Sequence, residues 1–233
     1  MTLRTLGGIA GLTCAGTYIF GFALLVTLLA PLGFGSGDID NAAVIAFLQS
    51  NQGIMILWNS VIYIVNALAL SVLVVALSKR ISAHTPDWGT VTLAFGLVWA
   101  TLVLGAGMIA NIGIENAVAL AETDMDAAIQ MWSIMHAVEL GLGGGNEIAG
   151  GVWILSVSLA GLKFRLFGKY IAGLGILTGL GGLLTIFTPL GETPGAVFGL
   201  GAIAWFIAIG LHLAFSRTAK EKVATVQPTA PAH

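Results

Sequence analysis

Apolar residues fill six long runs of the chain, and most charged residues lie in the segments between these runs. A bilayer core about 30 Å thick is crossed by roughly 20 helical residues, because each residue adds about 1.5 Å. A helix also satisfies its backbone hydrogen bonds within one segment, which hydrocarbon requires. The pattern therefore predicts an all-α polytopic membrane helix bundle with six transmembrane helices, at about residues 6–32, 53–77, 91–114, 129–162, 170–190 and 195–215.

The fourth run is longer than a simple crossing needs. As one helix, residues 129–162 would extend for about 50 Å, which exceeds the bilayer core. Three consecutive glycines, from Gly143 to Gly145, weaken its middle, since each costs about 1 kcal/mol relative to alanine in a helix. We expect the fourth helix to be kinked or broken there.

Two segments outside the runs have their own character. Residues 38–52 place apolar Ala42, Ile45, Ala46 and Leu48 beside polar Asn41, Gln49 and Asn51. This pattern fits a short external helix on the membrane, capped by Asp38 or Asp40, and fits an ordered loop equally well. Residues 218–233 contain two prolines and lack apolar periodicity, so a disordered cytoplasmic tail is predicted. The remainder, residues 1–217, is predicted to be one transmembrane domain.

The cations fall on one side of a chain that crosses six times. They lie before the first run, between the second and third, between the fourth and fifth, and after the sixth: Arg4, Lys79, Arg80, Lys163, Arg165, Lys169, Arg217, Lys220 and Lys222. The other connections carry acids and no cation. Because Lys and Arg accumulate on the cytoplasmic side, this distribution predicts a plasma (inner) membrane protein with both termini in the cytoplasm.

Composition agrees with this class and excludes others. Charged residues make up 9% of the chain, hydrophobic residues 57%, and the mean hydropathy is +0.96. A soluble domain has about 25% charged residues. The net charge of −2 gives no basic surface for nucleic acid. Cys14 is the single cysteine, so the chain cannot form an internal disulfide.

Three acids lie inside or at the edge of apolar runs: Glu115, Glu139 and Glu147. A charge at the bilayer centre costs at least about 2.5–3.5 kcal/mol, so such residues normally face the bundle interior or water. On a continuous fourth helix, His136, Glu139 and Glu147 would form one stripe. The same spacing aligns Asn111 with Glu115 on the third helix, and a set of polar residues on the second: Asn59, Tyr63 and Asn66.

These three stripes have similar predicted depths, in the outer half of the membrane or near its middle. They predict one polar, acidic pocket between the second, third and fourth helices, open to the outside. The alternative interpretation is structural. Glu115 would then end the third helix at the interface, His136 would be a satisfied interfacial residue, and the Asn59–Tyr63–Asn66 stripe would form interhelical hydrogen bonds.

The sequence gives little support for a metal, a cofactor or a catalytic apparatus. His136 and Glu139 could share an ion, with Glu115 and Glu147 completing the set. Di-metal helix bundles, however, use Glu-x-x-His twice, and here the order is reversed and occurs once. No Gly-x-Ser-x-Gly elbow is present. We therefore expect no metal and no cofactor, and an enzyme is the weakest hypothesis.

Several segments resemble a family of bacterial six-helix membrane proteins that is described only as a domain of unknown function. The resemblance includes residues 6–12, residues 41–45 and the turn at 163–173, where Lys169 replaces the usual proline. Its clearest part is Glu147-Ile148-Ala149-Gly150-Gly151-Val152-Trp153, similar to the family's Glu-x-x-x-Gly-x-Trp in the fourth span. The resemblance implies the six-helix topology and a role for Glu147, and it implies no activity.

Two functions remain open at this point. One is an outward-facing pocket that binds or transports a small solute or a proton. The other is a non-catalytic accessory, sensory or assembly protein whose buried polar residues are structural. In both cases the expected surroundings are the lipid bilayer, with a second copy or another membrane protein as a further partner.

Overall fold

The computed structural model describes residues 1–34, 39–144 and 147–215, and these residues contain helices and no strand. The described residues form eight α-helices: α1 Leu3–Leu24, α2 Asn41–Asn59, α3 Asn66–Ser82, α4 Pro86–Ala121, α5 Met125–Glu139, α6 Ile148–Lys163, α7 Lys169–Leu184 and α8 Thr193–Phe215. Three π-helical turns join or extend them: η1 Leu25–Leu29, η3 Ser60–Val65 and η4 Leu140–Gly144. Two short 3-10 turns complete the set: η2 Ala30–Leu32 and η5 Thr188–Leu190. The all-α prediction is confirmed.

Four helical stretches of the described residues are long and apolar enough to cross a membrane: Leu3–Leu32, Asn41–Ser82, Pro86–Ala121 and Thr193–Phe215. They correspond to the first, second, third and sixth predicted spans. The fifth, α7, is apolar but shorter than predicted, since it ends at Leu184 rather than near residue 190. Pro189 follows in the next turn, and proline lacks the amide hydrogen that a continuing helix requires.

The fourth predicted span is divided in two. α5 ends at Glu139, η4 follows, and Gly143 has a φ of 148°, which lies outside the helical region. α6 starts afresh at Ile148. A residue with a side chain rarely adopts such a φ, so the predicted break occurs where a glycine permits it, while Gly145 lies outside the described residues.

The segment before the second apolar run, which was predicted to be either a short external helix or a loop, is helical. Asp40 caps α2 through its Oδ1 atom, which accepts hydrogen bonds from the backbone amides of Ala42 at 3.1 Å and Ala43 at 3.0 Å. Asn51 has non-helical angles (φ −132°, ψ 24°) and divides α2 into two parts, the second of which continues through η3 into α3. Asp38 and the tail at 218–233 lie outside the described residues.

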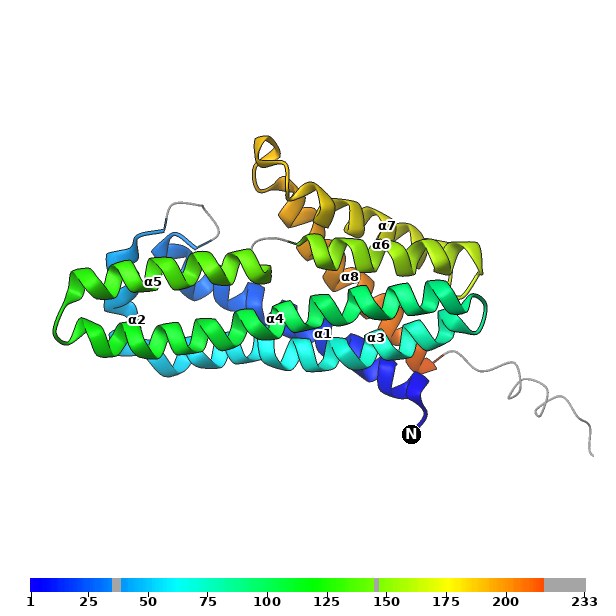
Figure 1. Ribbon diagram of the computed structural model, residues 1–233, viewed down its shortest axis with the longest axis horizontal. Helices are drawn as coiled ribbons and strands as arrows, with labels where there is room; N and C mark the ends of the chain where they lie inside the picture. The colour runs from blue at the N-terminus through cyan, green and yellow to red at the C-terminus, as the bar shows by residue number, and fades with distance from the viewer. Residues whose placement is uncertain (35–38, 145–146, 216–233) are drawn as a thin grey trace, which may run out of the picture.

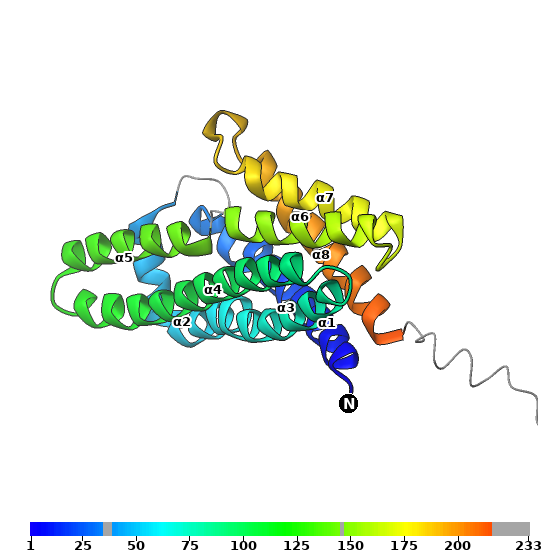
Figure 2. The same ribbon diagram turned by 45° about the vertical axis from the view of Figure 1, so that its right-hand side comes forward.

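The helices form one elongated bundle. Figure 1 shows α4 running along most of the long axis, with α5 and α6 following one another beside it. α6 pairs with α7, and α1 pairs with α8, an arrangement that Figure 2 shows from a second angle. The N-terminus, the α3–α4 turn and the α6–α7 turn lie towards one end, and the α4–α5 turn lies at the other.

Small residues bring two of these pairs into backbone contact. A Cβ atom on Gly151 of α6 would lie 2.8 Å from the carbonyl oxygen of Gly179 on α7. One on Gly11 of α1 would lie 3.1 Å from the Cα of Gly210 on α8. Close approach of this kind stabilises helix pairs in lipid, where apolar burial alone contributes little.

The buried residues form two apolar clusters. The larger cluster joins α1, α3, α4, α6 and α8, and three tryptophans with no more than 2% exposure lie in it: Trp99, Trp153 and Trp205. The smaller cluster joins η1, α2, α5 and the end of α4, and includes Met55, Ile114 and Trp132. The space where the two clusters meet contains the site described next.

Candidate functional site

A cavity of about 480 Å³ lies where α1, α2, α4, α5 and α8 approach one another. Its volume is within the range of about 300–1,000 Å³ that is usual for small-molecule sites. Both apolar clusters contribute to its wall, through Val103 and Tyr63 of the larger and Met55 and Trp132 of the smaller. The loops before α2 and α8 also reach it, through Ile39 and Glu192.

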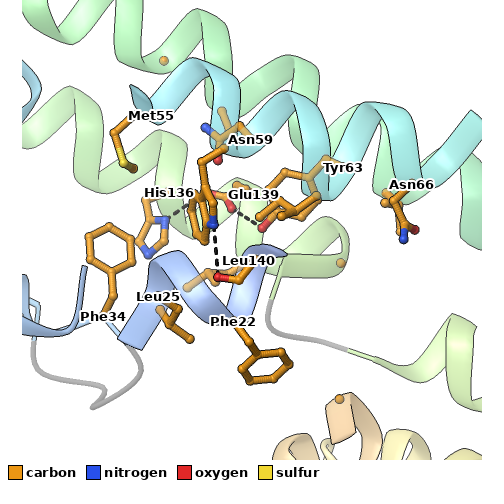
Figure 3. A pocket seen from close by; sticks show the side chains of 18 of the residues that line it. Phe22, Leu25, Phe34, Met55, Asn59, Tyr63, Asn66, His136, Glu139 and Leu140 are labelled. Carbon is orange, nitrogen blue, oxygen red and sulfur yellow. Dashed lines mark hydrogen bonds and ion pairs between the residues drawn. The ribbon is translucent and has the colours of Figure 1, made fainter. Parts of the chain in front are cut away.

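A carboxyl group joins two polar side chains on one wall of this cavity. The Tyr63 hydroxyl donates a hydrogen bond to Oε1 of Glu139 at 2.5 Å, and Nδ1 of His136 lies 2.9 Å from Oε2 of the same residue (Figure 3). Tyr63 and Glu139 are each 8% exposed. The cluster therefore connects η3 with α5 and gives both carboxyl oxygens a partner, as a buried carboxylate requires.

Aromatic rings surround His136. The Trp132 ring stacks on the imidazole with a centroid distance of 4.8 Å and an interplanar angle of 14°, one helical turn away on α5. Phe34 contacts the imidazole edge-on at 5.8 Å, and Phe34 also packs against Trp58 at 6.4 Å. These rings hold the imidazole in place beside Glu139 and make most of the nearby wall apolar.

Each of the three π-helical turns among the described residues contributes to the cavity. Leu25 comes from η1, Tyr63 from η3, and Leu140 and Gly143 from η4. A π turn inserts one residue into a helix, and such turns are rare and concentrate at functional sites. An inserted residue also rotates the following part of the helix by about 100°. Side chains after the π turn therefore point in a different direction from the one that the regular helical spacing would predict.

The two asparagines of the second predicted stripe have different roles. The Asn66 side-chain amide donates a hydrogen bond to Oγ1 of Thr17 at 2.6 Å and thereby joins α3 to α1. Asn59 also lines the cavity and is 3% exposed, but its side chain has no hydrogen-bond partner among the described residues. The structural interpretation therefore holds for Asn66, whereas Asn59 leaves a polar group available to an occupant of the cavity.

Glu147 lines the same cavity from the other side of the helix break. It precedes the first turn of α6 and is partly buried, and its side chain caps no backbone amide of that turn. A carboxylate is favoured at a helix N-terminus because the helix dipole is positive there. The continuous stripe from His136 to Glu147 does not exist, since the helix breaks at Gly143, but its ends still meet at one cavity.

Two predicted residues do not reach the cavity. Glu115 is exposed on α4, and Asn111 instead donates from Nδ2 to Oγ of Ser60 at 3.1 Å. The face of α4 that lines the cavity carries Ala110 and Ile114. Positions 111 and 115 are each one residue further on, which rotates them by about 100° away from that face.

Several cavity residues were missed by the sequence argument. Tyr18, Phe34 and Trp58 gave no polar signal, and Phe34 and Glu192 come from connecting segments without periodicity. Trp132 was detectable, since it lies one helical turn before His136. In the described residues, no group of three His, Cys, Asp or Glu side chains could hold a metal ion.

These observations define an all-helical protein, with four apolar helices able to cross a membrane and an acidic, aromatic cavity between them. Comparison with models of known protein families found no match, and neither did comparison with curated proteins or with solved structures. The resemblance to the six-helix family therefore stays a prediction.

Proposed function

We propose that this protein is an integral membrane protein whose cavity binds a small, partly apolar solute from the outer side of the membrane. The observation that carries the proposal is the Tyr63–Glu139–His136 cluster in the wall of a 480 Å³ cavity. Small-molecule sites combine a mainly apolar wall with a few polar groups that orient the ligand. Transport of the solute or of a proton would need a second, inward-open state, and binding is the part that the geometry supports.

The proposed topology has six crossings with both termini in the cytoplasm of a bacterial cell. The short helices α6 and α7 would complete the fourth and fifth crossings. Arg4, Lys79 and Lys169 are all at helix ends that lie towards the same end of the bundle, whereas Asp124 lies at the opposite end. This separation supports the assignment, because cations accumulate on the cytoplasmic side.

The topology can be tested by thiol labelling, since Cys14 is the only cysteine and is fully buried. A membrane-impermeant maleimide should label Thr123→Cys in intact spheroplasts and Ala83→Cys only after lysis. Both positions are in exposed turns. The opposite pattern, or equal labelling of the two variants, would overturn the topology.

The second candidate function is a non-catalytic accessory or assembly protein. It is favoured by the Asn66–Thr17 hydrogen bond, which joins two helices and offers nothing to a solute. In that case the polar groups would fix helix register, no solute would bind, and substitutions in the cavity would change stability alone.

A cavity-filling variant separates these two functions. Gly195 of α8 lines the cavity, and a Cβ atom there would meet no atom within 4 Å. The matched control is Gly173 of α7, which is exposed, does not line the cavity, and is equally open. Gly195→Phe should therefore obstruct the cavity, and Gly173→Phe should not.

Binding can be measured by calorimetry on nanodisc-embedded protein with three probes of similar size: benzyltrimethylammonium, benzyl alcohol and phenylacetate. The proposal expects saturable binding of at least one probe, weakened by Gly195→Phe by about tenfold or more and unchanged by Gly173→Phe. Absence of saturable binding by all three probes, or an equal effect of the two substitutions, would refute it.

A further inference from the structure

The charged side chains that line the cavity are all acidic. Glu139, Glu147 and Glu192 contribute carboxyl groups, and no lysine or arginine is among the described residues that line it. Within the described part of the wall, His136 is the one basic side chain, and it is already paired with Glu139. In a medium of low dielectric constant, an ionised carboxylate attracts a cation and repels an anion more strongly than in water.

The aromatic residues of the wall favour the same ligand charge. Trp58, Trp132 and Phe34 lie within one connected group of rings, and Tyr18 and Phe22 extend the aromatic wall on the α1 side. A cation over an aromatic face is attracted by the negative charge of the ring's π system, and desolvated sites show the largest effect. Rings of this kind recognise alkylated ammonium groups.

An unpartnered polar group adds an independent indication. Asn59 lies one helical turn before Tyr63, is 3% exposed, and has no side-chain hydrogen-bond partner among the described residues. Its carbonyl oxygen can accept from a ligand N–H or orient the positive end of a ligand. The Asn59 amide lines the cavity and is not sealed from it, so it is available to water or to a ligand in the cavity.

We propose that the cavity is a site for an organic cation, an amine or ammonium compound with an apolar body, whose charged group lies towards Glu139 and whose body contacts the aromatic rings. This inference rests on the proposed function and specifies the class of solute. An amine could come from a free solute or from the headgroup of phosphatidylethanolamine. The free solute fits better, because the described wall offers no lysine or arginine to a phosphate.

The three probes introduced above test the charge directly. Benzyltrimethylammonium should bind at least about tenfold more tightly than benzyl alcohol, and phenylacetate should bind most weakly. Glu139→Gln should remove this preference. Glu115→Gln is the matched control, since it makes the same change on an exposed face of α4 outside the cavity and should leave the preference intact.

A second variant avoids dependence on the folding of Glu139→Gln. Trp132→Leu keeps the carboxyl group and should weaken benzyltrimethylammonium binding severalfold with little effect on benzyl alcohol. Trp88→Leu is its control, because Trp88 is partly exposed near the start of α4 and does not line the cavity. Circular dichroism and melting temperature of each variant identify any that fails to fold.

The outcomes separate the two proposals. If benzyl alcohol or phenylacetate binds as tightly as the cation, and Gly195→Phe still blocks binding, the cation inference is wrong and the solute-binding function stands. If no probe binds, both are wrong. If adding phosphatidylethanolamine to phosphatidylglycerol nanodiscs weakens benzyltrimethylammonium binding, the lipid headgroup is the ligand and the free-solute assignment falls. An unchanged affinity supports the free solute.

Discussion

Removing the Tyr63 hydroxyl gives the sharpest test of the cluster on which the site depends. Tyr63→Phe deletes one oxygen atom and leaves the ring, which is 8% exposed, in place. Oε1 of Glu139 then loses the donor at 2.5 Å, while Oε2 keeps its contact with His136 at 2.9 Å. The substitution therefore isolates one hydrogen bond between η3 and α5.

Two effects set the magnitude of the loss. A hydrogen bond to a charged group contributes about 1.5–3 kcal/mol to stability, whereas hydrogen bonds between transmembrane helices average about 0.6 kcal/mol. Because both partners are buried, the loss of stability should be nearer the value for a bond to a charged group. Water from the adjoining cavity can replace the lost hydroxyl and reduce that loss. We expect Tyr63→Phe to lower the free energy of unfolding by about 1.5 kcal/mol.

Unfolding in mixed micelles with increasing dodecyl sulfate, followed by far-ultraviolet circular dichroism, would measure this change. Tyr18→Phe is the control, because Tyr18 lines the same cavity and its hydroxyl makes no hydrogen bond to another described residue. A double-mutant cycle with Glu139→Gln should give a coupling energy of about 1–2 kcal/mol. A coupling energy below about 0.5 kcal/mol, or an equal loss in Tyr18→Phe, would refute the claim that this bond joins the two helices.

Further predictions concern the fold. Gly151→Ala should destabilise the protein by about 1–3 kcal/mol, because its Cβ would lie 2.8 Å from the Gly179 carbonyl oxygen, and Gly173→Ala should be nearly neutral in the same unfolding titration. Asp40→Ala should cost about 1 kcal/mol and speed hydrogen exchange in the first turn of α2, and unchanged exchange would contradict the capping interaction. Gly143→Ala should cost about 1–3 kcal/mol because its φ is 148°, and unaltered stability would argue against the break.

The features that could be predicted were those that depend on local sequence. Runs of apolar residues predicted the helices, and the glycines after Leu142 predicted the break, because a helix weakens wherever its own residues disfavour it. Asp40 was one of two proposed caps, and the cap depends only on the two amides that follow it. Glu139 and His136 were selected because a charge in an apolar run needs a partner, and the two residues are partners.

The features that could not be predicted depend on packing between segments. The stripe argument assumed ideal helices at 100° per residue, but the π turns at η1, η3 and η4 change the register next to the cavity. Asn111 and Glu115 were misplaced for another reason: α4 is a regular helix, but residue spacing alone does not say which of its faces meets the neighbouring helices. Phe34 and Glu192 reach the cavity from loops, and no periodic pattern marks such residues.

The cavity itself limits what the protein does. The cavity of about 480 Å³ is partly open to its surroundings, so solvent can enter it and the cost of a sealed, dry void does not apply. Gly113 and Gly199 line the cavity, but a Cβ atom on them would lie 3.1 Å from Met135 and 3.1 Å from Phe22, so these glycines permit close side-chain packing in the wall. If the cavity binds a solute as proposed, that solute would complete the contacts of this wall. Water satisfies Asn59 and Glu139 but gains little from the aromatic wall, and a molecule with one polar and one apolar part satisfies both.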